Sequence, residues 1–296
     1  MKCCAFLSMD NLDAFECYDH LLFDPLESLG WSVDEIPWKN QQTDWNQFEA
    51  VIIRSPWDYQ KAPQAFLKTL KRIDQSSAIL ENNYELVKWN IDKTYLKDLE
   101  EQGNEIVPSL WSTHFEGDQI DHYYRQLKTS EIIIKPTVSA GAEDTFWINR
   151  SESEKYIDRL SKIFDNRSFL IQPFMKNIIK EGEFSVFFFG DTYSHTILKT
   201  PKSNDFRVQE EHGGKLTKVI PEAKLLTSAR NLLHKITPMP LYSRMDYVRT
   251  DENSFALMEL ELIEPSLYFN MDPESPKRFA KVFDQWIKAR SGDSAH

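Results

Sequence analysis

The chain has 296 residues, of which 41% are hydrophobic and 13% aromatic, and its formal net charge is −11. This length suits two or three lobes with packed cores, and the composition excludes an intrinsically disordered chain. The excess of acidic groups argues against a protein that binds nucleic acid or an anionic membrane. No apolar run is long enough for a membrane span, and the stretch before Asp10 is too short for a signal peptide, so we expect a cytoplasmic protein.

The first part of the chain, residues 1–88, predicts a small α/β lobe. Strands are predicted by apolar runs at 2–8, 31–36 and 50–54, and helices by periodic patterns at 15–29 and 63–74. Gly30 ends the first helical pattern and Pro63 suits the first turn of the second. Strands that alternate with helices are typical of a partly parallel sheet.

The rest of the chain predicts two further lobes of mixed α and β structure, residues 89–174 and 175–296. In the first of these we expect helices at 92–101 and 153–164 and strands at 131–135, 144–148 and 168–172. In the second we expect strands at 183–189 and 192–199, a polar loop at 200–214, a helix at 222–236, two strands near residue 250 and a closing helix at 275–289. This last lobe should be rich in antiparallel sheet.

The two strands near residue 250 predict a β-hairpin. Segments 242–249 (YSRMDYVR) and 255–262 (FALMELEL) alternate polar and apolar residues on either side of turn formers. A four-residue loop at 251–254 would pair Asp246 with Glu259 and Arg244 with Glu261. The residues expected on the apolar face of the second strand are Met258, Leu260 and Leu262.

Three carboxylates of this hairpin, those of Asp246, Glu259 and Glu261, would then crowd beside one fixed positive charge. Such carboxylates repel, so the cluster predicts a divalent cation, and all-oxygen ligands favour Mg²⁺ or Mn²⁺ over zinc. Because Mg²⁺ usually shares its ligand shell with phosphates, the hairpin also indicates a nucleotide. The alternative is a solvated ladder of salt bridges. We expect an amide at Asp246 or Glu259 to abolish magnesium-dependent turnover and to leave the fold intact.

Cationic residues near predicted strand ends and loops suit phosphate binding. Lys135 ends a strand of isoleucines, and in the loop that follows, Ser139 and Gly141 offer a hydroxyl and a backbone that can approach phosphate oxygens. Lys93 lies near the start of a helix, and Arg207 lies in the polar loop, where a forked guanidinium can stabilise a phosphoryl group. Taken singly, each of these cations is equally consistent with an exposed, solvated side chain.

Substrate contacts are predicted where strand 50–54 ends, because ligands of open α/β sheets bind beyond the carboxyl ends of the strands. There Arg54 could pair with a substrate carboxylate, and Trp57 and Asp58 follow it in the loop RSPWDY. The alternative is a capped turn with packing aromatic residues. Glu264 and Ser266, just beyond the hairpin, are further candidates for substrate contact.

The order of these elements resembles the ATP-grasp superfamily, in the branch of glutathione synthetase and the ribosomal-protein glutamate ligase. The resemblance runs from about residue 83 to 265 and rests on NIDKTYLKDLEEQGNEIVPSL, IIIKPTVSAGAEDTF, FLIQPF, GEFSVFFFGDTYSHTILK, FRVQEEHGG, and SRMDYV followed by LMELELIEPSLYF. RSPWDY and ELELIEPSLYF are also similar to the cycloserine-forming ligases of this branch. Two features depart from the family: Glu261 stands where asparagine is usual, and the loop after Lys135 lacks the usual run of glycines.

The resemblance implies an α/β ATP-grasp fold, in which ATP lies between two lobes built on antiparallel sheets and beside an N-terminal substrate lobe. It implies that Arg207 stabilises the transferred phosphoryl group and that Asp246, Glu259 and Glu261 hold Mg²⁺. The residues that it places against ATP are Lys93, Lys135, Gln172, Pro173, Phe174 and Glu183.

The function that the resemblance implies is an ATP-dependent carboxylate–amine ligase. A substrate carboxylate attacks the γ-phosphate of ATP, and an amine then captures the acyl phosphate, with release of ADP and phosphate. The expected partners are a small-molecule carboxylate and amine, such as an amino acid or a short peptide, and a homo-oligomer remains open. The alternatives are a small-molecule kinase on the same fold and a non-catalytic nucleotide-binding regulator.

Overall fold

The N-terminal part of the molecule is built on a parallel sheet that is covered on both faces. The computed structural model describes residues 1–13, 15–203 and 205–292. Four strands occur in the order β2-β1-β3-β4, with β1 at Lys2–Ser8, β2 at Trp31–Pro37, β3 at Ala50–Ser55 and β4 at Ile79–Glu81. All neighbouring pairs are parallel, which confirms the predicted α/β arrangement.

The two faces of this sheet pack against different helices, as the period of two along β1 requires. Ala5 and Leu7 pack in one cluster with Phe66 and Leu70 of α2 (Pro63–Asp74). Cys4 and Phe6 pack in another cluster with residues of α9 (Ser275–Arg290). A parallel sheet that is buried on both faces explains the near-continuous apolar runs of its strands.

The predicted helix at 15–29 is shorter in the structure. A single 3₁₀ turn, Asp19–Leu22, precedes α1, which spans only Phe23–Glu27 and is followed by Gly30 in a left-handed conformation (φ +85°). Pro25 explains the difference, because its ring has no N–H to donate and clashes with the carbonyl four residues earlier. Residue 14 lies outside the described residues.

A second sheet, antiparallel throughout, follows in the chain. Its order is β5-β8-β6-β7, with β5 at Leu110–Ser112, β6 at Glu131–Pro136, β7 at Phe146–Asn149 and β8 at Phe169–Pro173. Helices α5 (Ile120–Gln126) and α6 (Ile157–Ile163) share a core cluster with it. The strand predicted at 144–148 begins two residues later, because Asp144 has a left-handed backbone (φ +51°) that a strand does not accommodate.

The third sheet holds the predicted hairpin. Its order is β11-β10-β9-β12-β13, with β9 at Glu183–Phe189, β10 at Thr192–Thr200, β11 at Lys215–Val219, β12 at Tyr242–Arg249 and β13 at Phe255–Glu261. All four pairs are antiparallel, as predicted. The sequence patterns do not predict six of the elements in the structure. These are the strand β11 directly after the polar loop, the short strands β4 and β5, and the helices α3 (Tyr84–Asn90), α5 and α7 (Asn177–Lys180).

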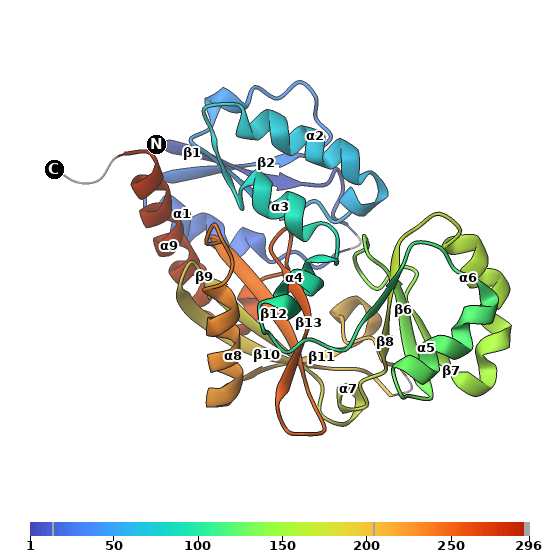
Figure 1. The fold of residues 1–296 in the computed structure, drawn as a ribbon. Helices are drawn as coiled ribbons and strands as arrows, with labels where there is room; N and C mark the ends of the chain where they lie inside the picture. The colour runs from blue at the N-terminus through green and yellow to red at the C-terminus, as the bar shows by residue number, and fades with distance from the viewer. Residues whose placement is uncertain (14, 204, 293–296) are drawn as a thin grey trace.

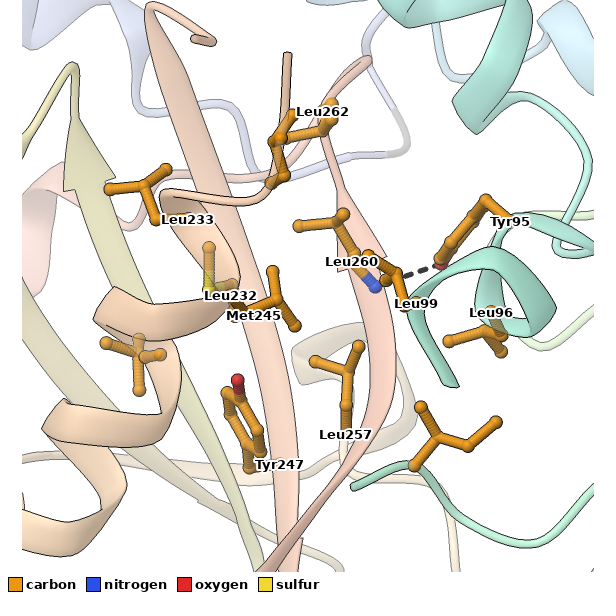
Figure 2. Packing of buried hydrophobic residues seen from close by; sticks show 14 of the residues in the cluster. Tyr95, Leu96, Leu99, Leu232, Leu233, Met245, Tyr247, Leu257, Leu260 and Leu262 are labelled. Carbon is orange, nitrogen blue, oxygen red and sulfur yellow. Dashed lines mark hydrogen bonds between the residues drawn. The ribbon is translucent and has the colours of Figure 1, made fainter. Parts of the chain in front are cut away.

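Helices α4 (Tyr95–Glu101) and α8 (Ala223–Leu233) cover one face of the third sheet (Figure 2). Leu99 and Leu232 pack with Met245 and Leu260 of the hairpin, and the Leu260 backbone N–H donates a hydrogen bond to the Tyr95 hydroxyl oxygen at 2.9 Å. On the other face, Phe187 and Phe189 pack with residues of α9, so α9 lies between the first and third sheets (Figure 1). The predicted lobe boundaries, at residues 88 and 174, remain predictions.

The remaining turns are single 3₁₀ segments at Trp45–Gln47, Tyr59–Lys61, Gly117–Gln119, Arg150–Tyr156, Glu210–His212 and Phe269–Met271. Arg150–Tyr156 replaces the first turn of the helix predicted at 153–164. Among the described residues, no helix combines the length and the apolar character that crossing a membrane would need.

Asn82 connects the first sheet to the third. Its side-chain amide donates to the backbone oxygens of Tyr242 (2.9 Å) and Leu262 (2.7 Å), and its carbonyl accepts from the Leu241 N–H (2.7 Å). Asn82→Ala should lower the free energy of unfolding by about 3 kcal/mol, because it leaves these buried backbone groups without partners. Urea unfolding beside Asn166→Ala, a change at an exposed residue, measures the effect, and a loss below about 1 kcal/mol would contradict it.

Candidate active site

A cavity of about 1140 Å³, here called the central cavity, lies where the three sheets meet. Trp57 and Tyr59 line it from the loop after β3, Lys135 and Gln172 from β6 and β8, and Glu259 from β13. The structure brings together all the predicted site residues in its lining except Arg54 and Asp246: Trp57, Asp58, Lys93, Lys135, Ser139, Gly141, Gln172, Pro173, Phe174, Glu183, Arg207, Glu259, Glu261, Glu264 and Ser266.

The register of the hairpin is confirmed. Arg244 lies opposite Glu261 and Asp246 lies opposite Glu259, with a bulge directly after Asp246. The bulge corrects one expectation, because Met258 lines the central cavity, whereas Leu260 and Leu262 lie in the core on the other face. A bulge gives one strand an extra residue and so interrupts the alternation on which the prediction for Met258 rested.

Asp246 lies behind the cavity and neutralises two buried cations. Its side chain is only 3% exposed and pairs with Arg244 (3.0 Å) and Lys199 (3.4 Å), and it also accepts a hydrogen bond from Ser185. Burial raises the pKa of this carboxyl, but the charges of Arg244 and Lys199 outweigh that effect and hold the pKa below its usual range. Lys199 also pairs with Glu183, one of the predicted ATP contacts.

Glu259 and Glu261 are the predicted metal ligands that line the cavity. Glu259 pairs with Lys93 (3.1 Å), and Glu261 pairs with Arg244. Burial raises the pKa of Glu261 to about 7, against the effect of Arg244, and the negative charges of Asp246 and Glu259 add to the rise. Within the described part of the chain, no three Asp, Glu, His or Cys side chains are gathered into a metal shell. The donor set nevertheless consists of carboxylate oxygens that a cation would neutralise, which suits a hard divalent ion.

Lys135 lines the cavity from the end of β6 and is unpaired among the described residues. Among the described residues, no hydrogen bond or ion pair engages its ammonium, and burial lowers its pKa. Lys93, by contrast, donates to the Ser139 carbonyl oxygen (2.8 Å) as well as pairing with Glu259. Gly141 in the same loop has a left-handed backbone (φ +59°), a conformation that glycine adopts readily.

One end of the cavity has aromatic walls. Phe174 stacks on Trp147 of β7 with ring centroids 4.2 Å apart, and Phe206 contacts Trp147 edge-on at 5.8 Å. Neither Trp147 nor Phe206 was predicted as a site residue from the sequence. The alternation along β7 could have identified Trp147. Its neighbours Phe146 and Ile148 have side chains in the core of the second sheet, so alternation places the side chain of Trp147 on the opposite face.

Arg207, the predicted catalytic residue, lines the cavity from the polar loop. Its guanidinium pairs with Asp205 at 2.9 Å, and its side chain is 38% exposed. Close by in this loop, Glu210 accepts a hydrogen bond from the Tyr18 hydroxyl, with O–O distances of 3.1 and 3.2 Å. Residue 204 lies outside the described residues.

Arg54 does not reach the cavity. It is 1% exposed and pairs with Asp19 at 2.8 Å, while its guanidinium also donates to the Pro265 carbonyl (3.3 Å) and lies over the Tyr242 ring. Its predicted contact with a substrate carboxylate is therefore not supported. Arg54 lies near the carboxyl end of β3, as predicted, but residues of the third sheet cover it there. A sequence pattern within one lobe does not reveal such a contact with another lobe.

The loop after Arg54 does line the cavity and contacts the residues beyond β13. The Trp57 indole N–H donates to the Glu264 carbonyl oxygen at 2.9 Å. Asp58 accepts from the Trp38 indole at 2.6 Å and pairs with Lys39. Burial raises the pKa of Glu264 to about 8, and the negative charges of Glu261 and Glu259 add to the rise.

Comparison with solved structures gives the fold. The chain superposes on the crystal structure of D-cycloserine synthetase DcsG with a TM-score of 0.85 and 24% identity, over 97% of this chain and 100% of that one. It superposes on the ATP-grasp ligase PsnB, solved with a minimal precursor variant, Mg and ADP, with a TM-score of 0.68 and 14% identity, over 97% and 98% of the two chains. The chain therefore has the ATP-grasp fold, as predicted.

Sequence comparison shows which proteins the chain resembles. Residues 4–82 match the family model of the N-terminal domain of D-cycloserine synthetase DcsG. The chain is 28% identical over 283 residues to the cycloserine biosynthesis protein DcsG of Streptomyces lavendulae, which covers 90% of this chain and 93% of that protein. The resemblance to the cycloserine-forming branch is thus confirmed, and with it the predicted class, an ATP-dependent ligase.

Proposed function

We propose that the central cavity binds ATP with Mg²⁺ and that the protein joins a substrate carboxylate to an amine through an acyl phosphate. The observation that carries this proposal is the ammonium of Lys135, which lines the cavity and has no hydrogen-bond or ion-pair partner among the described residues. A desolvated cation needs an anion, and a phosphate group of ATP would supply it. Lys93 and Arg207 would add positive charge on the same lining.

The nucleotide base would lie at the aromatic end of the cavity. Gln172, Pro173 and Phe174 supply backbone groups at the end of β8, and Phe206 closes this end from the polar loop. Apolar walls with a few fixed polar groups are what a small-molecule site requires. Trp147, stacked behind Phe174, would fix the plane of that ring.

Glu259 and Glu261, with Asp246 behind them, would hold Mg²⁺, and Mn²⁺ remains a prediction as a substitute. When bound, the ion would neutralise the phosphate oxygens. Residues of the chain would position the reacting groups. Lys135, Lys93 and Arg207 would hold the phosphates against the substrate carboxylate, and the loop around Arg207 would limit access of water to the acyl phosphate.

The reaction would need no protein nucleophile. A carboxylate oxygen of the substrate attacks the γ-phosphorus, and the bond from phosphorus to ADP breaks. The neutral amine then attacks the acyl carbon, the C–N bond forms and phosphate leaves, with the amine proton passing to solvent. Because the DcsG proteins to which the chain is similar in sequence and in fold are named for cycloserine, we propose a small, amino-acid-like substrate rather than a protein.

Trapping of the acyl phosphate tests this function. With ATP, Mg²⁺ and pooled amino acids, we expect hydroxylamine to yield a hydroxamate together with ADP. A stable phosphorylated product that resists hydroxylamine would favour a kinase instead. Binding of ATP with neither product from any pool would contradict the proposed ligase activity.

A further inference from the structure

The segment directly after β13, residues 262–266, is held by side chains rather than by secondary structure, and is here called the wall segment. In the described parts of the chain, no backbone group forms a hydrogen bond with the backbone of residues 263–266. Side chains from outside the segment approach its carbonyl oxygens in succession instead. These contacts are Asn82 to Leu262 (2.7 Å), the Tyr242 hydroxyl to Ile263 (2.9 Å), Trp57 to Glu264 (2.9 Å), Arg54 to Pro265 (3.3 Å) and Arg244 to Ser266 (3.4 Å).

The wall segment forms part of the central cavity. Glu264 and Ser266 line the cavity, whereas Pro265 between them is buried outside its lining. The segment also follows directly on Glu261, one of the predicted metal ligands. Because a helix or sheet does not fix this backbone, its position depends on the side chains that bond its carbonyl oxygens. A shift of the Pro265 peptide would therefore move two cavity side chains together.

Arg54 links the wall segment to a second part of the cavity lining. Its guanidinium donates to one carboxylate oxygen of Asp19 through Nε (3.1 Å) and Nη2 (2.8 Å), and Nη2 also donates to the Pro265 carbonyl oxygen (3.3 Å). Residues just before Asp19 line the cavity and are here called the N-terminal wall: Phe15, Glu16 and Tyr18. Arg54 itself lies outside the lining, so it holds the two walls from behind.

We propose that Arg54 is a positioning residue of the ligase reaction, which fixes the wall segment against the N-terminal wall and so sets where the acid substrate lies. This inference rests on the proposed function, because it takes the acid substrate to lie against these walls. Arg54 acts through the Pro265 peptide and Asp19 and does not touch the substrate. Placement of a reacting group matters strongly, since an error of about 1 Å can cost about 100-fold in rate. The aromatic end of the cavity, where the nucleotide base would lie, does not depend on Arg54.

The variant Arg54→Lys tests this role. Its ammonium keeps the charge that Asp19 needs but lacks the fork that also reaches Pro265. With ATP, Mg²⁺, hydroxylamine and pooled amino acids, we expect the pool concentration for half-maximal hydroxamate formation to rise at least about tenfold, while the half-saturating ATP concentration changes less than about twofold. A residue that only stabilises the fold would not separate the two substrates in this way. An unchanged value for the pool, or equal rises for the pool and ATP, would overturn the inference.

Arg249→Lys is the matched control, because it makes the same change at another paired arginine. Arg249 bonds both carboxylate oxygens of Glu181, at 2.7 and 2.9 Å, and lies outside the cavity lining. We expect this variant to be less stable in urea unfolding and to keep both half-saturating concentrations. A rise for the pool as large as that in Arg54→Lys would trace the effect to lost stability and overturn the positioning role.

Tyr242→Phe tests the wall segment by a second route and decides if Arg54→Lys fails to fold. Tyr242 is fully buried outside the cavity lining, and the change removes only the hydroxyl beside the carbonyl oxygens of Ile263 (2.9 Å) and Ile53 (2.6 Å). We expect the same selective rise for the pool, at least about threefold. Wild-type values for both concentrations would overturn the role given to the wall segment.

Binding without turnover separates this inference from the proposed function. If the wild-type protein forms no hydroxamate, the proposed reaction falls, and the rise of Tm that the pool produces with Mg²⁺ and the non-hydrolysable analogue AMPPNP then decides about Arg54. Binding of the pool at least about tenfold weaker in Arg54→Lys, with unchanged binding of AMPPNP, would support the positioning role. Equal binding of the pool to both proteins, or no binding to the wild type, would overturn it.

Discussion

Replacement of Lys135 by methionine should reduce ATP-dependent turnover at least about 100-fold and leave the fold as stable as before. Both expectations follow from the same observation, because the ammonium is desolvated in the cavity and no described residue pairs with it. Methionine keeps most of the length of the side chain, removes a charge that burial disfavours, and leaves no protein carboxylate without its ion-pair partner.

Two measurements on Lys135→Met separate a role in the site from a role in the fold. Hydroxamate formation reports turnover, and urea unfolding reports stability. Lys68→Met, on the exposed side of α2, is the matched control and should behave as wild type in both. Full turnover in Lys135→Met would mean that Lys135 does not bind the phosphates, whereas a large loss of stability would mean that its charge has a structural partner.

Patterns within one segment predicted much of this fold. The alternation in 242–249 and 255–262 was sufficient to place Asp246 opposite Glu259, because register in a hairpin depends on the turn and on local periodicity. The α/β character of the first lobe and the antiparallel character of the third also followed from local patterns. Met258 was misplaced because a bulge inserts one residue without a clear mark in the sequence.

Contacts between distant segments could not be predicted in this way. Arg54 lies near the carboxyl end of β3 in its own lobe, but Asp19 and the third sheet bury it. Trp57 joins the loop after β3 to Glu264, which is 207 residues away in the chain. In the sequence, Lys199 is one more cation before a polar loop. Only the pairing of β10 with β9, which pairs with β12 on its other side, places Lys199 between Glu183 and Asp246.

The position of Lys199 changes the expectation for the metal-site variants. The sequence suggested that amides at Asp246 and Glu259 would both leave the fold intact. The structure instead makes Asp246 the shared partner of Arg244 and Lys199, both nearly buried, whereas Glu259 is partly exposed at the cavity wall. The two carboxylates therefore serve the same proposed metal but differ in what the fold requires of them.

Asp246→Asn should lower the free energy of unfolding by about 3 kcal/mol, because it breaks a buried ion-pair network and leaves two cations with less negative charge beside them. Glu259→Gln should lower it by less than about 1 kcal/mol, since its one partner, Lys93, keeps the Ser139 carbonyl and lies at the open cavity. Urea unfolding of both variants measures the difference, and assays below the unfolding transition should show both to be deficient in magnesium-dependent turnover. Equal stabilities would mean that Glu183 and Glu261 suffice to neutralise Lys199 and Arg244, and the network around Asp246 would then serve the chemistry alone.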